Sequence, residues 1–170
     1  MNKTVRVALV ALLCVGAAAC SKKQEVKPQP QAPVETTQTA PAPVSDGKYT
    51  PADLDTDACL RQRVVYFDFD KTEIKPEFQQ IMACHAKYLQ DRPMAQVRLE
   101  GNTDERGTRE YNLGLGERRA NAVGSALEAA GGSASQVTVI SYGKEKPTCR
   151  EHNEECWAKN RRVEIVYTAK

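Results

Sequence analysis

The hydrophobic period of the chain changes within one stretch, residues 96–127, and this change constrains the fold most strongly. Residues 96–100 alternate apolar and polar side chains, which predicts a strand with one buried face. Glycine and polar residues at 101–103 are expected to end that strand, and a charged turn, DERG, follows. From residue 108 the apolar positions recur with helical spacing, on a face formed by Leu113, Gly116, Ala120, Val123 and Leu127. The stretch therefore predicts a strand, a polar loop and an amphipathic helix.

The same two kinds of pattern recur on either side of this stretch. They predict further strands at residues 64–69, 137–142 and 162–168, and helices at 76–91 and 154–159. A short polar turn or helix is expected at residues 53–60. The resulting order, β-α-β-α-β-(α)-β, predicts an α+β domain with two helices packed on one face of a mixed four-stranded sheet.

The first part of the chain is typical of an exported and lipid-anchored protein. Residues 1–19 have a basic start and an apolar run too short to span a bilayer, as in a signal peptide. Small residues lead directly to Cys20, which predicts cleavage before Cys20 and acylation of this residue. By resemblance to bacterial lipoproteins, Ser21 after the cysteine implies export to the outer membrane. The alternative is ordinary secretion with a free Cys20.

The composition changes after the lipidation site and again near residue 51. Residues 20–50 are rich in Pro, Gln, Thr and Ala, so they cannot bury a core, and we expect a disordered tether. Residues 51–170 are expected to form the folded domain. Its arginine pairs lie far apart in the sequence, and the formal net charge of the chain is only +2. Without a basic stripe interleaved with aromatic residues, nucleic acid is excluded as the main partner.

Two opposite charges flank the start of the helix that is expected from residue 108. Asp104 lies on the loop near the positive end of the helix dipole. Arg119 falls on the same flank as Asn112, at the edge of the apolar face, whereas Arg118 is expected to point into solvent. An acceptor and a two-pronged donor suit a zwitterion, with its ammonium on Asp104 and its carboxylate on Arg119. The alternatives are a structural Asp104–Arg119 pair and a solvated charged loop.

Several motifs resemble one known family. The segments GNTDERG and EYNLGLGERRANAV are similar to the signature of the OmpA-like peptidoglycan-binding domains, and VVYFDFDKTEI, ISYGKEKP and NRRVEIVY match the same family in order. The resemblance covers roughly residues 64–167 and is strongest to the lipoprotein branch that acts with the Tol system. It implies that Asp104 and Arg119 bind the diaminopimelate residue of the peptidoglycan stem peptide. It also implies partners among the periplasmic Tol-system proteins, and a role in envelope integrity and cell division.

Further residues are expected in the same binding site. In this family the residues matching Phe69 and Asp70 line the peptide pocket beside the main pair. The predicted peptidoglycan-binding residues are Asp104, Arg119, Phe69, Asp70, Asn112, Thr103 and Gly107.

The cysteines predict two disulfides. Of the 6 cysteines, Cys14 lies in the signal peptide and Cys20 is the lipidation site, which leaves an even number in an exported domain. Cys149 and Cys156 bracket one short loop and are natural partners, so the other pair is Cys59 and Cys84. The alternative is a metal site formed by Cys149, His152 and Cys156, although its spacing differs from the usual C-x₂-C pairs. His85 lies on an apolar stripe and is expected in the core.

Two short motifs permit an enzymatic interpretation. Residues 66–72, YFDFDKT, resemble the nucleophile motif of haloacid-dehalogenase-type phosphatases, but no magnesium-binding acidic pair follows. The same residues lack the turn glycine and the closing glutamate of a calcium loop. Ser141 and Lys144 have the spacing of penicillin-binding-protein nucleophiles, but at a strand end and without the partner motifs.

We therefore predict a wall-binding lipoprotein that is not an enzyme and uses no cofactor. The alternative is a protein-interaction module of the Tol system with little direct wall binding, whose soluble partner covers the same TDERG surface.

Overall fold

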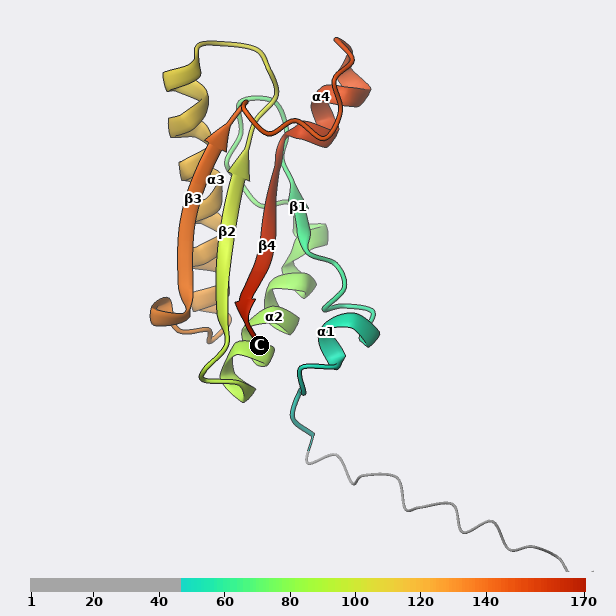
Figure 1. Ribbon diagram of the computed structural model, residues 1–170, viewed down its shortest axis with the longest axis vertical. Helices are drawn as coiled ribbons and strands as arrows, with labels where there is room; N and C mark the ends of the chain where they lie inside the picture. The colour runs from blue at the N-terminus through green and yellow to red at the C-terminus, as the bar shows by residue number, and fades with distance from the viewer. Residues whose placement is uncertain (1–46) are drawn as a thin grey trace, which may run out of the picture. The chain divides into compact units, whose positions relative to one another are not determined.

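The computed structural model describes residues 47–170 (Figure 1). The predicted signal peptide, Cys20 and residues 20–46 of the predicted tether lie outside the described residues. The strands are β1 (Val64–Tyr66), β2 (Gln96–Asn102), β3 (Val137–Gly143) and β4 (Arg162–Ala169). The α-helices are α1 (Asp53–Thr56), α2 (Gln79–Asp91), α3 (Arg109–Ala129) and α4 (Glu154–Asn160), and short 3₁₀ helices cover Pro76–Phe78 and Ala134–Gln136. No helix within residues 47–170 combines the length and the apolar character needed to cross a bilayer.

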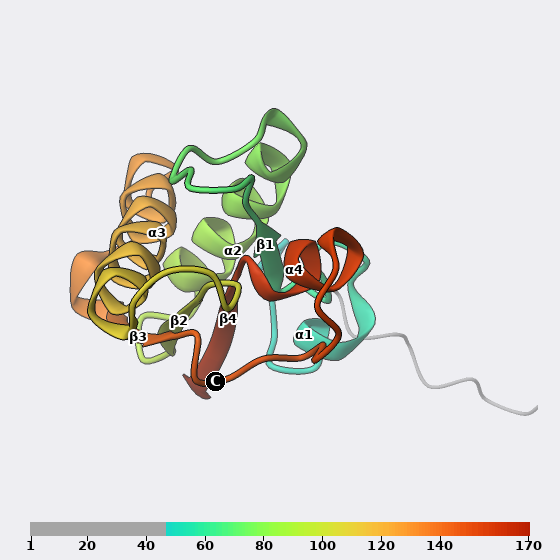
Figure 2. The same ribbon diagram turned by 90° about the horizontal axis from the view of Figure 1, so that it is seen from above.

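The four strands form one mixed sheet in the order β1-β4-β2-β3. The β2 and β3 strands are parallel, whereas β4 runs antiparallel to both of its neighbours. The two long helices, α2 and α3, pack on the same side of this sheet (Figure 2). The predicted α+β architecture is therefore confirmed.

Two strands end more than one residue away from the predicted position. The β1 strand ends at Tyr66, and the chain then turns, with Asp70 in the left-handed region at a φ of 57°. The β2 strand continues through Gly101 and Asn102, which were expected to break it, and it shifts register between them. Gly101 therefore does not end the strand; it lies where β2 and α3 approach each other closely.

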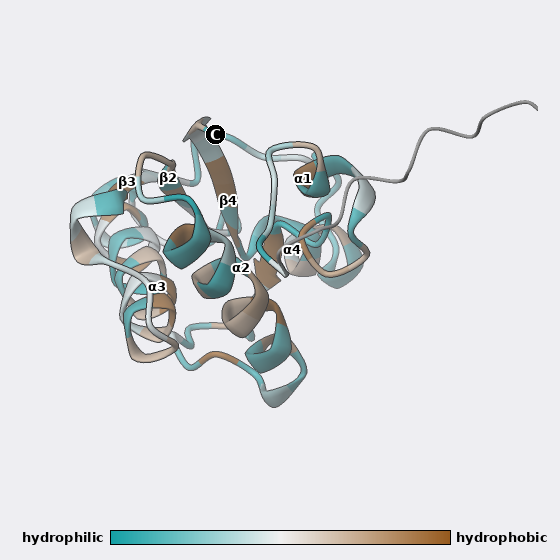
Figure 3. Ribbon diagram, turned by 90° about the horizontal axis from the view of Figure 1, so that it is seen from below, coloured by the Kyte–Doolittle hydropathy of each residue, from teal (hydrophilic) through white to brown (hydrophobic). Residues whose placement is uncertain are grey.

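The core lies between the sheet and the helices. In Figure 3, hydrophobic and hydrophilic stretches alternate along α2 and α3, as expected for helices with one buried face. Leu54 and Leu60 from the predicted polar segment are also fully buried. The core cluster includes Val65, Phe67, Ile81, Met82, Leu89, Val97, Leu99, Val123, Leu127 and Ile165.

His85 is a core residue, as predicted. It is fully buried, with Nδ1 2.8 Å from the Tyr167 hydroxyl and Nε2 3.0 Å from the Gln62 carbonyl oxygen. Burial disfavours the charged ring and lowers the pKa of His85 below its ordinary value. The neutral imidazole thus joins α2 to β4 and to the segment before β1.

Two disulfides join the predicted partners. Cys59–Cys84 ties the segment before β1 to α2, and Cys149–Cys156 closes the loop that enters α4. Because Cys149 and Cys156 are joined to each other, their thiolates are not available for the alternative metal site with His152.

Candidate functional site

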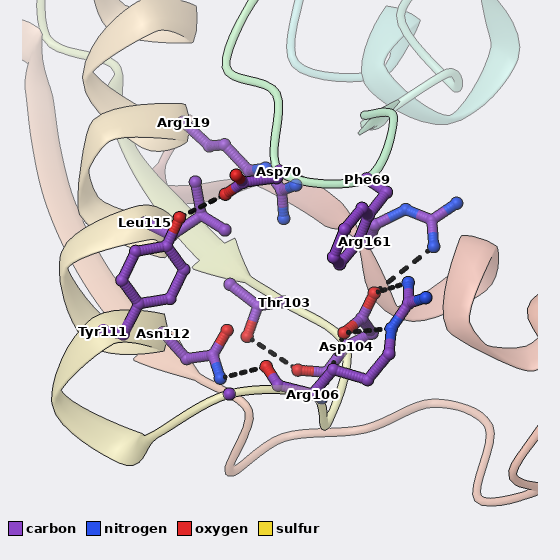
Figure 4. Close-up of a pocket in the computed structure, with 11 residues that line it drawn as sticks. Phe69, Asp70, Thr103, Asp104, Arg106, Tyr111, Asn112, Leu115, Arg119 and Arg161 are labelled. Atoms are coloured by element: carbon purple, nitrogen blue, oxygen red, sulfur yellow. Dashed lines mark hydrogen bonds and ion pairs between the residues drawn. The ribbon is translucent and has the colours of Figure 1, made fainter.

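A pocket of ≈ 220 Å³ opens where β2 ends and α3 begins (Figure 4). The loop after β1 and the residue before β4 complete its walls. It is lined by Phe69, Asp70, Thr103, Asp104, Arg106, Gly107, Tyr111, Asn112, Leu115, Arg119 and Arg161. The fold therefore brings all seven predicted binding residues to one pocket, although they come from three separate segments of the chain.

The TDERG loop is held by the first turn of α3. The Thr108 side chain caps the helix by accepting a hydrogen bond from the Tyr111 backbone N–H at 3.2 Å. The Asn112 amide donates to the carbonyl oxygens of Arg106 and Thr108 at 2.8 and 3.0 Å. Gly107 adopts a φ of 90°, which favours glycine, and lets the loop turn into the helix. These contacts within the protein therefore fix the conformation of the loop without any contribution from a ligand.

Asp104 is buried and pairs with two arginines. Its Oδ2 lies 2.5 Å from Arg106 Nη2 and 3.3 Å from Arg161 Nη1, and its Oδ1 accepts from the backbone N–H of Arg106 at 3.1 Å. Burial acts to raise the pKa of Asp104, but the hydrogen bonds from these arginines outweigh it and keep the pKa below its ordinary value. The structural Asp104–Arg119 pair considered from the sequence is not formed.

Arg119 is completely buried, not at the edge of an apolar face as predicted. Its guanidinium donates to three backbone carbonyl oxygens, those of Lys71 at 2.8 Å, Asp68 at 3.0 Å and Asn102 at 3.2 Å. Within residues 47–170 it forms no ion pair with a carboxylate. Burial lowers the pKa of Arg119 to about 10, so the side chain remains charged at neutral pH. It is therefore a buried cation that lines the pocket and, among residues 47–170, has no carboxylate within ion-pair distance, although Asp104 and Asp70 attract it from further away.

The mouth of the pocket is aromatic. Phe69 and Tyr111 are 55% and 47% exposed. The Tyr111 hydroxyl donates to Asp70, which the left-handed turn directs toward α3 (Figure 4). Leu115, which was not assigned to the apolar face of the helix, is buried and supplies an apolar wall in place of the half-buried Leu113.

Sequence reasoning missed both partners of Asp104. Arg106 stands two residues away, so the TDERG motif itself contained that signal. Arg161 lies 57 residues away at the end of α4, and nothing local in the sequence connects it with Asp104. Trp157 was also missed; its ring lies 4.2 Å from the Arg106 guanidinium.

The two catalytic motifs do not assemble catalytic pairs. Asp68 is exposed and pairs with Lys75 at 2.8 Å, and it does not line the pocket with Asp70, so the DFDKT carboxylates do not share one site. The Ser141 hydroxyl donates to the Leu113 carbonyl at 2.7 Å. The Lys144 ammonium instead donates to the carbonyl oxygens of Glu105 and Gly107.

Comparison with known proteins identifies the class. The model of the OmpA family matches residues 66–161, and the chain belongs to this family. The predicted resemblance to its lipoprotein branch is also confirmed. A peptidoglycan-associated lipoprotein of Haemophilus influenzae is 43% identical over 167 residues, which is 98% of this chain and 100% of that protein. One from Pseudomonas aeruginosa is 49% identical over 113 residues, 66% of this chain and 67% of that protein.

Solved structures agree with these sequence comparisons. The crystal structure of the peptidoglycan-associated lipoprotein from Burkholderia pseudomallei is similar with a TM-score of 0.67 and 45% identity, covering 68% of this chain and 98% of that chain. The C-terminal domain of Helicobacter pylori MotB has the same fold, with a TM-score of 0.58 at 24% identity, covering 63% of this chain and 84% of that chain.

Proposed function

We propose that the pocket binds the diaminopimelate residue of an uncrosslinked peptidoglycan stem peptide, and that the protein links the outer membrane to the cell wall without catalysis. The carboxylate of the ligand binds Arg119, and its ammonium binds Asp104. The observation that carries this proposal is the environment of Arg119, a fully buried guanidinium held by three carbonyl oxygens.

A ligand carboxylate fits this environment because a guanidinium has five N–H donors. Three of them are directed to the carbonyl oxygens of Asp68, Lys71 and Asn102, so two remain for an anion in the pocket. An anion bound there supplies the counter-charge that the buried cation lacks within residues 47–170. Leu115 and Phe69 offer apolar contacts to the methylene chain that separates the two charged ends of diaminopimelate.

The rest of the proposal concerns the envelope. The names of the relatives support association with peptidoglycan. Acylated Cys20 anchors the chain to the outer membrane, and the tether lets the domain reach the wall. At about 3.1 Å per residue, some 30 extended residues span roughly 90 Å. In this position the protein acts with Tol-system partners in envelope integrity and cell division.

Calorimetric titration tests the binding site directly. The soluble chain from residue 21 onward, with both disulfides formed, is titrated with a diaminopimelate-containing muropeptide. We expect Arg119→Ala and Asp104→Ala each to weaken binding by roughly 2–5 kcal/mol, because each leaves a buried charge of the ligand unpaired. Arg118→Ala is the matched control, since Arg118 is the exposed neighbour of Arg119 on α3 and should bind as the wild type.

Circular dichroism confirms that each variant is folded before it is titrated. The proposal is wrong if the wild type does not bind, or if the folded Arg119→Ala variant binds as tightly as Arg118→Ala.

The second candidate is a protein-interaction module of the Tol system. The exposed rings of Phe69 and Tyr111 favour it, because aromatic residues at a pocket mouth are typical of protein interfaces. If the partner covers this mouth, saturation with the muropeptide must exclude a soluble Tol-system protein. Simultaneous binding of both would refute the shared surface.

A further inference from the structure

The acceptor positions of Asp104 are already filled by the protein. A carboxylate offers about four lone-pair positions on its two oxygens. Oδ1 accepts from the backbone N–H and the Nε of Arg106, at 3.1 and 3.2 Å. Oδ2 accepts from Arg106 Nη2 at 2.5 Å and from Arg161 Nη1 at 3.3 Å. A ligand ammonium therefore finds no vacant acceptor position on Asp104 unless one of the two guanidinium groups moves.

Arg161 is the fixed partner of Asp104. Its side chain is only 6% exposed, its Nε donates to the Phe67 carbonyl at 3.0 Å, and its Nη2 lies 2.6 Å from Glu154 Oε1. Displacing it would leave the Phe67 carbonyl and a buried cation without their partners, which is unfavourable.

Arg106 is the partner that can leave. Its side chain is 32% exposed, and its guanidinium lies 4.0 Å from the centroid of the Phe69 ring and 4.2 Å from that of the Trp157 ring. A second carboxylate, that of Glu154, is already 3.7 Å from its Nη1. If Arg106 moves away from Asp104, it can therefore still pair with the carboxylate of Glu154.

We infer that Arg106 is an internal substitute for the ammonium of the ligand, and that a zwitterionic ligand binds by replacing the Arg106 side chain on Asp104. The inference rests on the proposed function, because it concerns the ammonium half of the same pocket. The two halves of the pocket then differ before a ligand binds. Arg119 has N–H donors that are not used by the protein, whereas the acceptor positions of Asp104 become free only when a ligand cation replaces Arg106.

This exchange makes the positive charge of the ligand a condition for full binding. A free amine carries that charge, whereas an acylated amine does not and cannot replace a guanidinium on a carboxylate. The exchange also lowers the apparent affinity for the ligand, because the ion pair between Asp104 and Arg106 must break before the ligand ammonium can bind. Removing Arg106 should therefore tighten the binding of a ligand with a free amine and leave a ligand with an acylated amine almost unaffected.

The test uses Trp157, because it is the only tryptophan in the chain and lies against the Arg106 guanidinium. The soluble chain from residue 21 onward is titrated with a diaminopimelate-containing muropeptide, and separately with the same muropeptide acetylated on its free amine. Affinity is measured by calorimetry, and Trp157 emission is recorded in parallel. The variants are Arg106→Gln and, as a matched control, Arg109→Gln, which removes the same charge from an exposed residue paired with Glu145.

We expect Arg106→Gln to bind the free-amine muropeptide at least roughly threefold more tightly than the wild type, because the variant lacks the partly exposed cation that competes for Asp104. Arg109→Gln should bind as the wild type does. The emission of Trp157 should change when the wild type binds this ligand. It should not change when the wild type is titrated with the acetylated ligand, or when Arg106→Gln binds either ligand.

Three results would overturn the inference, and they have different consequences for the proposed function. If the wild type binds but Arg106→Gln binds equally or more weakly, or if Trp157 emission stays constant in the wild type, Arg106 is not displaced and the proposed function still stands. If neither the wild type nor Arg106→Gln binds the muropeptide, the proposed function and the exchange fail together.

Discussion

Gly101 of β2 and Gly116 of α3 lie backbone against backbone. A Cβ atom on Gly101 would stand 1.9 Å from the carbonyl oxygen of Gly116, and one on Gly116 would stand 2.4 Å from Ser141 Oγ. This close approach presses α3 onto the end of β2. Arg119, three residues further along the helix, therefore reaches the carbonyl oxygen of Asn102, the residue after Gly101. A contact between two glycines thus positions the buried cation of the pocket.

Gly101→Ala should therefore destabilise the whole domain. We expect the free energy of unfolding to fall by about 3 kcal/mol, the upper end of the range for overpacking, because the obstructing atom belongs to backbone. Urea denaturation measures the change. Gly124→Ala is the control on the same helix, since its Cβ would meet Leu99 and Val137 at ordinary distances of 3.5 and 3.7 Å. Alanine should be neutral there or stabilising by up to about 1 kcal/mol; equal losses at both sites would contradict this explanation.

Arg119→Lys tests whether the shape of the guanidinium matters in addition to its charge. Lysine keeps the charge but cannot donate in the plane to the separate carbonyl oxygens of Asp68, Lys71 and Asn102. Leaving buried carbonyl groups unpaired should lower the free energy of unfolding by about 2 kcal/mol. Thermal or urea unfolding measures it, beside Arg118→Lys, which should stay within about 0.5 kcal/mol of the wild type. A fully stable Arg119→Lys variant would show that the carbonyl contacts are dispensable.

The pKa values of the two histidines should be shifted in opposite directions from the ordinary value. Burial lowers the pKa of His85 below 6.5, so its contribution to stability decreases as the pH falls below 6.5 toward its folded-state pKa. The hydrogen bond to Glu105 raises the pKa of His152, so its contribution is fully present below pH 6.5 and disappears as the pH rises through its folded-state pKa. NMR titration of the ring C–H signals separates the two, because the chain contains only 2 histidines. Two coincident curves near pH 6.5 would contradict the described environments.

The two disulfides should affect different properties. Replacing Cys59 and Cys84 by serine removes a link across a sequence separation of 25 residues. Loop entropy predicts a loss of roughly 3.5 kcal/mol of unfolding free energy, measured by urea denaturation. Replacing Cys149 and Cys156, separated by 7 residues, should remove only about 2.4 kcal/mol.

Removal of the Cys149–Cys156 disulfide should cost less stability but should weaken ligand binding in the pocket more. The Cys149–Cys156 loop leads into α4, whose Trp157 donates to Glu105 of the TDERG loop at 2.7 Å. Muropeptide binding should therefore weaken more in the Cys149→Ser/Cys156→Ser variant than in the Cys59→Ser/Cys84→Ser variant. Calorimetry compares the affinities of the two variants at a temperature where both are folded. If binding weakens more in the Cys59→Ser/Cys84→Ser variant, the position of α4 does not matter for binding in the pocket.

Most of the architecture follows from local sequence patterns. The change of period after residue 100 predicted the β2–α3 unit. The even number of cysteines predicted disulfides, and the short loop between Cys149 and Cys156 predicted their pairing. Helical spacing also distinguished Arg119 from Arg118, of which only Arg119 is buried. These features could be predicted because each depends on residues close together in the chain or on a small number of possible partners.

The ionic arrangement of the pocket was decided only by the tertiary structure. Whether Asp104 pairs with Arg119, Arg106 or Arg161 depends on where α4 ends relative to the TDERG loop, and no periodicity in the sequence encodes that distance. Likewise, Arg119 is buried because the turn after β1 supplies the carbonyl oxygens of Asp68 and Lys71, which are 51 and 48 residues away. Charge pairing acts over a few ångströms in space, so local sequence selects the charged residues and the packing of distant segments selects their partners.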